Sequence, residues 1–177
     1  MTLLKVDVKK ILYATDLSEN ARYAFAYAVS LADLYNAAIT IIHVLPEVPA
    51  LLDQSVIGYI SAERWEEIKS QQLDEAKEAL IGKKREHQAI KEALHQFSED
   101  VKQQQKGDGF TTDEIIVERG NPVEEIIRNA EERNCDLVVM GTHGQGTLAD
   151  VMLGSTARRV IRRSKMPVLV VRLPGEE

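Results

Sequence analysis

Glycine and hydroxyl residues gather in two short segments near the C-terminus that could together bind a phosphate group. The first reads Met140-Gly141-Thr142-His143-Gly144, and nine residues then separate it from Gly154-Ser155-Thr156. Glycines let the main chain approach a bulky anion closely. The second segment begins a predicted helix, whose free N–H groups and positive dipole end suit phosphate, and its two hydroxyls add donors. The spacing predicts a phosphate site divided between two loops, which is neither a Walker A loop nor the G-x-G-x-x-G fingerprint.

Two further groups follow the first and second predicted strands. The first strand ends in Ala14-Thr15-Asp16. The carboxylate of Asp16 could accept hydrogen bonds from ribose hydroxyls or help to hold a metal ion on the phosphates. The alternative, in which Asp16 only caps the next helix, is equally open. The second strand ends in His43-Val44-Leu45, and its main-chain edge could hydrogen-bond an adenine base.

Short apolar runs rich in β-branched residues predict the strands that position these groups. Four continuous runs cover residues 11–15, 38–44, 135–140 and 167–171, and a weaker fifth covers 112–117. Helical patterns lie between them: one over 18–35, one opened by Pro122, and one opened by Gly154 with Ala157, Val160 and Ile161 facing inward. This alternation predicts a doubly wound α/β fold, in which helices cover both faces of a parallel sheet. Such sheets bind ligands at the carboxyl ends of their strands.

Residues 46–109 form an extended loop and helical segment that interrupts this alternation. Within the charged stretch 61–106, apolar residues fall at alternating steps of three and four from Leu73 to Val101. One interpretation is a helix that packs a single stripe on the sheet, and the other is a coiled-coil-like seam for a protein partner. An unbroken helix of this length would run to about 70 Å. We therefore expect a break, and Gly82 is the candidate position.

Length and composition exclude several classes of protein. The 177 residues predict a single domain over 1–177. The net charge of −6 argues against nucleic-acid binding. The single Cys135 excludes an internal disulfide framework and a cysteine-cluster metal site, and we expect it to be a core residue. No apolar run reaches the length of a membrane span, and no signal peptide is recognised, so we expect a cytoplasmic protein.

At these residues the chain resembles the universal stress protein family. Residues 10–19 are similar to its first strand and turn, and 165–171 to its last strand. The pattern Gly141-x2-Gly144-x9-Gly154-Ser155 is similar to the signature of the ATP-binding branch. The resemblance implies a flavodoxin-like, five-stranded sheet of order 3-2-1-4-5. It also implies a homodimer in which the last strands, here Val168–Val171, pair across the dimer axis.

The resemblance further implies an adenine nucleotide, ATP or else ADP or AMP, with Mg or Mn bound through its phosphates. The implied binding residues are Ala14, Thr15, Asp16 and Val44 for the base and ribose, and Met140, Gly141, Thr142, His143, Gly144, Gly154, Ser155 and Thr156 around the phosphates. Two departures stand out. Ala14 replaces a common proline and is expected to loosen the first turn, and Gln145 replaces a basic residue beside the phosphates.

The resulting functional hypothesis is a nucleotide-binding switch or sensor in the stress response. No general base, arginine finger or carboxylate pair is evident for phosphoryl transfer, and His143 has no partner at a matching spacing. We therefore assign neither a catalytic residue nor a protein ligand to a metal. Two alternatives stay open: a slow metal-dependent ATPase, in which Asp16 positions a metal ion and water, and an interaction module that works through the long helical segment.

Overall fold

Five parallel strands form one sheet with the order β3-β2-β1-β4-β5. The computed structural model describes residues 6–46, 62–104, 110–142 and 153–173, and for 62–80 it describes the helical backbone alone. The strands are β1 (Lys10–Thr15), β2 (Ala38–Pro46), β3 (Thr111–Gly120), β4 (Leu137–Gly141) and β5 (Val168–Val171). The predicted doubly wound sheet and its strand order are confirmed.

Two strands extend beyond their predicted ends. Apolar residues stop at Val44 in β2 and at Val117 in β3, yet the two strands stay paired as far as Pro46 opposite Gly120. The last residues of β3 include Glu118 and Arg119, which are half-buried. Charged side chains are accommodated there because β3 is an edge strand. Because these residues are charged, the apolar pattern in the sequence did not indicate where the strand ends.

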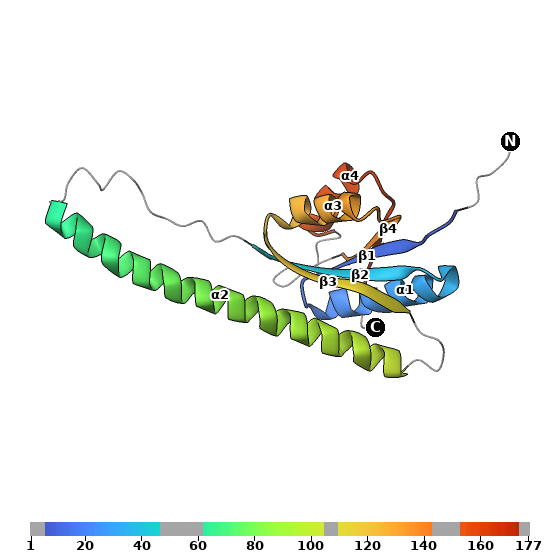
Figure 1. The fold of residues 1–177 in the computed structure, drawn as a ribbon. Helices are drawn as coiled ribbons and strands as arrows, with labels where there is room; N and C mark the ends of the chain where they lie inside the picture. Colours follow the sequence, from blue (N-terminus) through green and yellow to red (C-terminus); the bar gives the residue numbers. More distant parts are fainter. Residues whose placement is uncertain (1–5, 47–61, 105–109, 143–152, 174–177) are drawn as a thin grey trace.

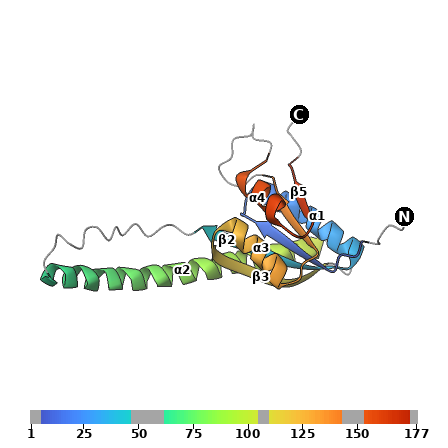
Figure 2. The same cartoon turned by 90° about the horizontal axis from the view of Figure 1, so that it is seen from above.

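Helices cover both faces of the sheet (Figures 1 and 2). The helices α1 (Glu19–Tyr35) and α2 (Ala62–Gln104) lie on one face, and α3 (Pro122–Glu132) and α4 (Ser155–Arg163) lie on the other. Each face has its own apolar core. The first is built around Tyr13 and Phe25, whose ring centroids are 4.8 Å apart. The second packs Leu12 and Val138 against α3 and α4.

The predicted helix starts are confirmed, but one predicted core residue of α4 is wrong. Ser18 caps α1 and Asn121 caps α3, while Gly154 is the residue before α4. Ala157 and Val160 are buried, whereas Ile161 is 45% exposed. Each helical residue is turned by about 100° from the one before it. Ile161 is therefore rotated away from the stripe that Val160 presents to the sheet.

The predicted break at Gly82 is wrong, because α2 continues as one helix of 43 residues through this position. A glycine costs a helix interior only about 1 kcal/mol. A methyl group at Gly82 would meet no atom within 4 Å beyond its chain neighbours and the adjacent helix backbone, and the neighbouring Ile81 is 51% exposed. No packing contact therefore forces the chain to turn here. At about 65 Å the helix runs well past the sheet (Figure 1).

The C-terminal half of α2 packs on the sheet, as the first of the two interpretations predicts. Leu94 is buried, and Ile90, Phe97 and Val101 are partly buried against the core that contains α1. The Phe97 ring lies 5.1 Å from the ring of Phe25. The predicted seam residues over 73–80 lie outside the described side chains. Within the described part of the chain, no helix has an apolar stretch of membrane-spanning length.

Candidate functional site

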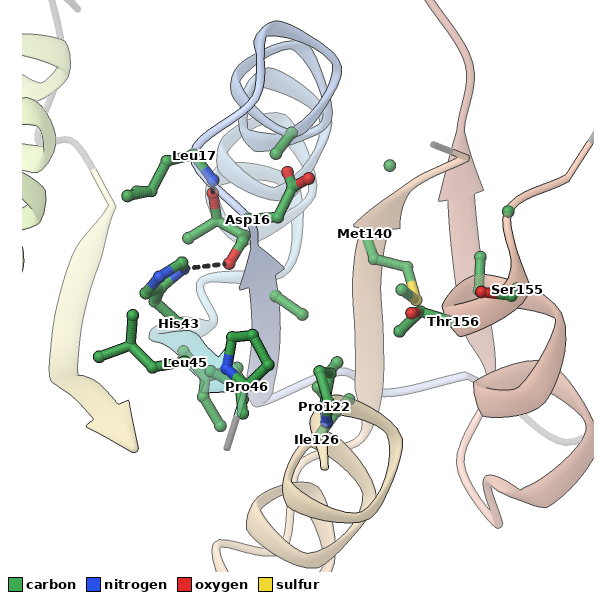
Figure 3. A pocket seen from close by; sticks show the side chains of 18 of the residues that line it. Asp16, Leu17, His43, Leu45, Pro46, Pro122, Ile126, Met140, Ser155 and Thr156 are labelled. Carbon is green, nitrogen blue, oxygen red and sulfur yellow. Dashed lines mark hydrogen bonds between the residues drawn. The ribbon is translucent and has the colours of Figure 1, made fainter. Parts of the chain in front are cut away.

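A cavity of about 580 Å³ opens at the carboxyl edge of the sheet (Figure 3). Its size falls within the range of small-molecule sites. The ends of β1, β2 and β4 and the starts of α3 and α4 surround it. The lining residues are Ala14, Thr15, Asp16, Leu17, Ala21, Ile42, His43, Val44, Leu45, Pro46, Ile90, Pro122, Ile126, Met140, Gly141, Thr142, Gly154, Ser155, Thr156 and Ala157.

Every predicted binding residue within the described part of the chain lines this one cavity. Residues of the first predicted segment, 140–142, meet those of the second, 154–156, and both face the end of β1. His143, Gly144 and Gln145 lie outside the described residues. The convergence follows from topology, because the carboxyl ends of parallel strands meet at the same edge of a sheet.

Side-chain hydrogen bonds hold the turn after β1. Oγ1 of Thr15 accepts a hydrogen bond from the N–H of Leu17 at 3.0 Å. Oδ1 of Asp16 accepts from the N–H of Ser18 at 3.1 Å and from its hydroxyl at 2.6 Å. Leu17 between them has a φ of 67°, in the left-handed region. Ala14 lies inside β1, opposite Ile42 and Met140, and so precedes this turn.

Asp16 supports the helix cap but is not itself the cap. The hydroxyl of Ser18 accepts a hydrogen bond from the N–H of Ala21 at 3.2 Å and so caps α1. Asp16 binds the same hydroxyl, and its carboxylate also lines the cavity. The two interpretations of Asp16 are therefore compatible, because one oxygen supports the turn and the carboxylate still faces the space where a ligand would lie.

His43 joins β2 to the end of β1 and was missed as a site residue. Its Nδ1 donates a hydrogen bond to the carbonyl oxygen of Thr15 at 2.8 Å, which leaves Nε2 as the acceptor in the neutral ring. The pairing of β1 with β2 ends at these two residues, while β2 stays paired with β3 to Pro46. The β1-facing main chain of Val44 and Leu45 is therefore turned toward the cavity. Histidine within an apolar strand gave no sequence signal for this role.

The start of α4 presents main-chain N–H groups to the cavity. The N–H of Gly154 donates to the carbonyl of Thr142 at 2.8 Å, and the N–H of Thr142 donates to that of Val171 at 2.9 Å. These bonds tie the helix start to β4 and β5. No side chain caps α4 at Gly154, and its first turn contains no acidic residue. In contrast, Ser18 and Asn121 cap α1 and α3, and both helices carry glutamates in their first turns.

Gly141 is required by a neighbour that the sequence did not reveal. A Cβ at Gly141 would lie 3.1 Å from Nδ2 of Asn20 and 3.2 Å from its Cγ. The same Nδ2 donates to Oγ1 of Thr142 at 3.1 Å, and both residues are buried. The absent side chain at Gly141 thus makes room for α1. Asn20 is 122 positions away in sequence from Thr142, so no local pattern could link the two.

The cavity has an apolar wall and little charge. Pro122 and Ile126 of α3 face Met140 across it (Figure 3). Among the described lining residues, Asp16 is the only carboxylate and none is lysine or arginine. The described part of the chain also contains no group of three His, Cys, Asp or Glu side chains that could hold a metal ion. A bound anion would therefore depend on main-chain N–H groups and hydroxyls.

Comparisons with known proteins match this chain to a family. Residues 7–172 match the model of the universal stress protein family. The universal stress protein MJ0577 of Methanocaldococcus jannaschii is 31% identical over 177 residues, covering 96% of this chain and 98% of that protein. The stress response protein NhaX of Bacillus subtilis is 30% identical, covering 92% and 97% of the two chains.

Solved structures show the same architecture. The structure of MJ0577 has a TM-score of 0.60 at 32% identity and covers 97% of this chain and all of that one. The universal stress protein UspA from Lactobacillus plantarum has a TM-score of 0.64 at 25% identity, covering 95% and 100% of the chains. A universal stress protein in complex with cAMP is alike in fold, with a TM-score of 0.57 at 21% identity over 94% of this chain and 98% of that one.

Proposed function

Because this chain belongs to the universal stress protein family, we propose that it binds ATP at the carboxyl edge of its sheet. In this proposal the protein acts in the cytoplasm as a dimeric switch or sensor of the stress response. The observation that carries the proposal is the uncapped start of α4, which faces the same cavity as Asp16 and the free main-chain edge of β2. A nucleotide needs this combination of an anion site, a carboxylate and a hydrogen-bonding edge.

Each part of the nucleotide has a complementary part of the cavity. The adenine would lie against Pro122 and Ile126 and hydrogen-bond the main chain of Val44. The ribose hydroxyls would donate to the carboxylate of Asp16. The phosphates would lie at Gly141 and over the first turn of α4, where N–H groups and hydroxyls can donate to them. The proposed binding residues are those predicted from the sequence, with His143 and Gly144 outside the described residues.

A divalent cation, Mg or Mn, would complete the phosphate end of the site. Among the described residues that line the cavity, none has a basic side chain that could offset the charge of a triphosphate. A cation held by the phosphates and by water would supply that charge. The fold accommodates an adenine nucleotide in at least one relative, since one fold neighbour was solved in complex with cAMP.

The switch is favoured over an enzyme because the described lining offers few groups for phosphoryl transfer. His43 is committed through Nδ1 to Thr15, and Asp16 is committed in part to the turn. A slow ATPase is the alternative, and phosphate release with and without Mg measures it directly. Turnover that is lost in Asp16→Asn, with binding retained, would establish the ATPase and replace the switch.

A second candidate function is an interaction module, and the length of α2 favours it. The N-terminal part of this helix extends beyond the sheet (Figure 1). In that case, deleting residues 61–82 would abolish association with a protein partner while ATP binding persists. Under the switch hypothesis, ATP would change the affinity for that partner.

The first experiment identifies the nucleotide that accompanies the purified protein and then weakens the phosphate site. Denaturation followed by chromatography is expected to release ATP or ADP near one per chain. Ser155→Asp places a negative charge where the phosphates would lie, yet an acidic residue in the first turn favours the helix itself. We expect a loss of about 100-fold in ATP affinity by calorimetry, with an unchanged melting temperature.

The control separates phosphate binding from binding of the base. Adenosine has no phosphate, so Ser155→Asp should change its affinity by less than about twofold. The matched variant Ser155→Asn has a similar size without the charge and should retain most of the ATP affinity. Undiminished ATP binding by Ser155→Asp would contradict the placement of the phosphates at α4. A protein that binds neither ATP nor adenosine would refute the nucleotide function itself.

A further inference from the structure

A second hollow, of about 640 Å³, lies between α2 and the outer strand β3. It shares no lining residue with the proposed nucleotide cavity. The helix contributes one side of it and the strand the other, and Arg133 after α3 closes one end. Its lining residues are Lys83, Lys84, His87, Gln88, Lys91, Glu114, Ile115, Ile116, Val117, Glu118, Arg119 and Arg133.

The hollow follows the free edge of β3 and does not lie over one face of the sheet. Six consecutive residues of the strand, 114–119, line it. Successive side chains of a strand point to opposite faces, so a hollow over one face would be lined by every second residue. Contact with all six places the hollow along the edge. β3 is the terminal strand of the sheet (Figure 2), so this edge carries main-chain groups that no strand of the described residues pairs.

This hollow forms a groove along the strand edge. The groove is positively charged, although the chain as a whole has a net charge of −6. Its lining contains five lysine and arginine residues but only two carboxylates. Both carboxylates are already paired: Glu114 accepts from Nε of Arg133 at 2.8 Å, and Glu118 pairs with Arg128. Lys83 and Lys84 have no ion-pair partner within the described part of the chain. The groove therefore has cations in excess.

The junction between α2 and β3 is also incompletely hydrogen-bonded. Nε2 of His87 and Nε of Arg119 are buried without a partner among the described residues. The Arg119 guanidinium pairs with Glu86 of α2, which holds the helix to the end of the strand. A buried polar atom without a hydrogen-bond partner destabilises a fold. An occupant that reorganises these side chains could recover part of that cost.

We propose that this groove binds an extended acidic peptide segment, which adds to β3 as a sixth strand. Main-chain hydrogen bonds to the edge would supply affinity, as they do wherever a peptide extends a sheet. Carboxylates of the peptide would pair with Lys83, Lys84 and Lys91 and so select acidic sequences. The six residues of edge in the groove correspond to about 20 Å of strand. This surface does not depend on nucleotide binding.

The edge is regular where the groove lies. A bulge in β3 falls at Asp113, because Thr112 pairs with Ile39 and Glu114 with the next residue, Thr40. Bulges and charges often protect edge strands from unwanted pairing. Here the bulge lies just before the groove, and the register is unbroken from Glu114 to Gly120. The groove segment is thus a continuous template for another strand.

The test measures binding of a defined acidic peptide by fluorescence anisotropy. The probe is a labelled peptide of eight residues that alternates glutamate and valine, added to the full-length protein. A peptide with lysine in place of glutamate should bind at least tenfold more weakly. The same acidic peptide with every main-chain amide N-methylated has no N–H to donate on either edge, and it should also bind at least tenfold more weakly.

Charge-reversed variants locate the site. The double variant Lys84→Glu/Lys91→Glu changes two exposed side chains and should weaken binding of the acidic peptide at least tenfold. The matched variant Arg162→Glu changes an exposed cation of α4 outside the groove and should change binding by less than about twofold. Circular dichroism melts confirm that each variant folds, and ATP affinity should be equal in all of them.

Three results would overturn the proposal. Undetectable binding of the acidic peptide at low salt would identify the edge as protected and unused. Equal binding of the N-methylated peptide would exclude strand addition. Displacement of the peptide by inorganic pyrophosphate, together with that equal binding, would instead identify a site for small anions.

Discussion

Thr15 joins β1 to β2 through its main chain and holds the turn after β1 through its side chain. Its carbonyl accepts from His43, and its hydroxyl oxygen accepts from Leu17. A bond between two side chains, those of Asn20 and Thr142, connects α1 to the end of β4. These buried contacts prepare the edge of the sheet before a ligand arrives. A preorganised site loses less free energy to ordering when it binds.

The fold suppresses the ionisation of the Cys135 thiol and therefore its reactivity. Burial raises the pKa of its thiol to about 11, so about one thiol in a thousand is ionised at pH 8. The thiolate is the reactive form, so the native protein should resist a thiol-reactive dye that labels the unfolded chain at once. Mass spectrometry of the labelled protein, with and without denaturant, measures this protection. Fast labelling of the native protein would contradict the burial of the thiol.

The same raised pKa predicts how stability depends on pH. Above the ordinary thiol pKa of 9.0, the unfolded chain loses its proton while the folded chain keeps it until about pH 11. Stability is therefore fully present below pH 9.0 and decreases as the pH rises toward 11. We expect Cys135→Ala to remove about 1–2 kcal/mol of that decrease in urea titrations. Parallel curves for the two proteins would show that the thiol does not contribute.

At the scale of elements, the helices differ in how they begin and in how far they extend. α1 and α3 begin with side-chain caps, whereas α4 begins without one at the cavity. α2 packs its C-terminal half through Leu94 and continues beyond the sheet at its other end. A helix that extends into solvent depends on its own propensity more than on packing. Gly82 is therefore expected to lower the stability of α2, and a substitution there measures by how much.

Substitutions at two glycines are expected to change the stability in opposite directions. Gly82→Ala places a methyl group in open space within a helix and should stabilise α2 by about 0.5–1 kcal/mol. Gly120→Ala should destabilise the protein by more than that. Gly120 has a φ of +155°, and a Cβ there would lie 2.9 Å from Oε1 of Glu125. Chemical denaturation measures both changes, and a destabilising Gly82→Ala would contradict a continuous α2.

The whole molecule ends in two edge strands with different surroundings, β3 beside α2 and β5 beside β4. In β5, the carbonyls of Pro167 and Val171 accept hydrogen bonds from Val138 and Thr142 on the β4 side. Main-chain groups alternate along a strand, so those of Val168 and Val170 point to the free edge. The proposed homodimer would use these outward groups, since pairing of β5 with its copy would remove an exposed edge.

Val170→Pro tests the proposed dimer, because it removes one outward N–H while leaving the β4 pairing intact. A proline is tolerated on an edge strand whose N–H faces solvent, so the monomer should fold. Light scattering during size-exclusion chromatography should give a dimer for the wild type and a monomer for Val170→Pro. Val170→Ile retains the N–H and should remain dimeric. A monomeric wild type, or a dimeric Val170→Pro, would contradict pairing through β5.

The sequence by itself determined the sheet and the location of the site. Continuous apolar runs such as 38–44 indicate strands buried on both faces, and their alternation with helices leaves few topologies. Topology then places whatever follows β1, β2 and β4 at one edge, so Asp16, Val44 and the residues around Gly141 and Gly154 could be grouped before any coordinates. The helix starts at Ser18 and Asn121 are equally local, because capping is chemistry within one turn.

The tertiary structure decided what depends on partners distant in sequence. Local pattern could not reveal that Asn20 fills the space beside Gly141, or that His43 holds Thr15. It also predicted a break at Gly82, because propensity says nothing about whether packing forces a turn. The charged end of β3 and the groove beside it emerged only when α2 was placed against that edge. Local propensities act within a few residues, whereas burial, pairing and cavities are properties of surfaces that the fold brings together.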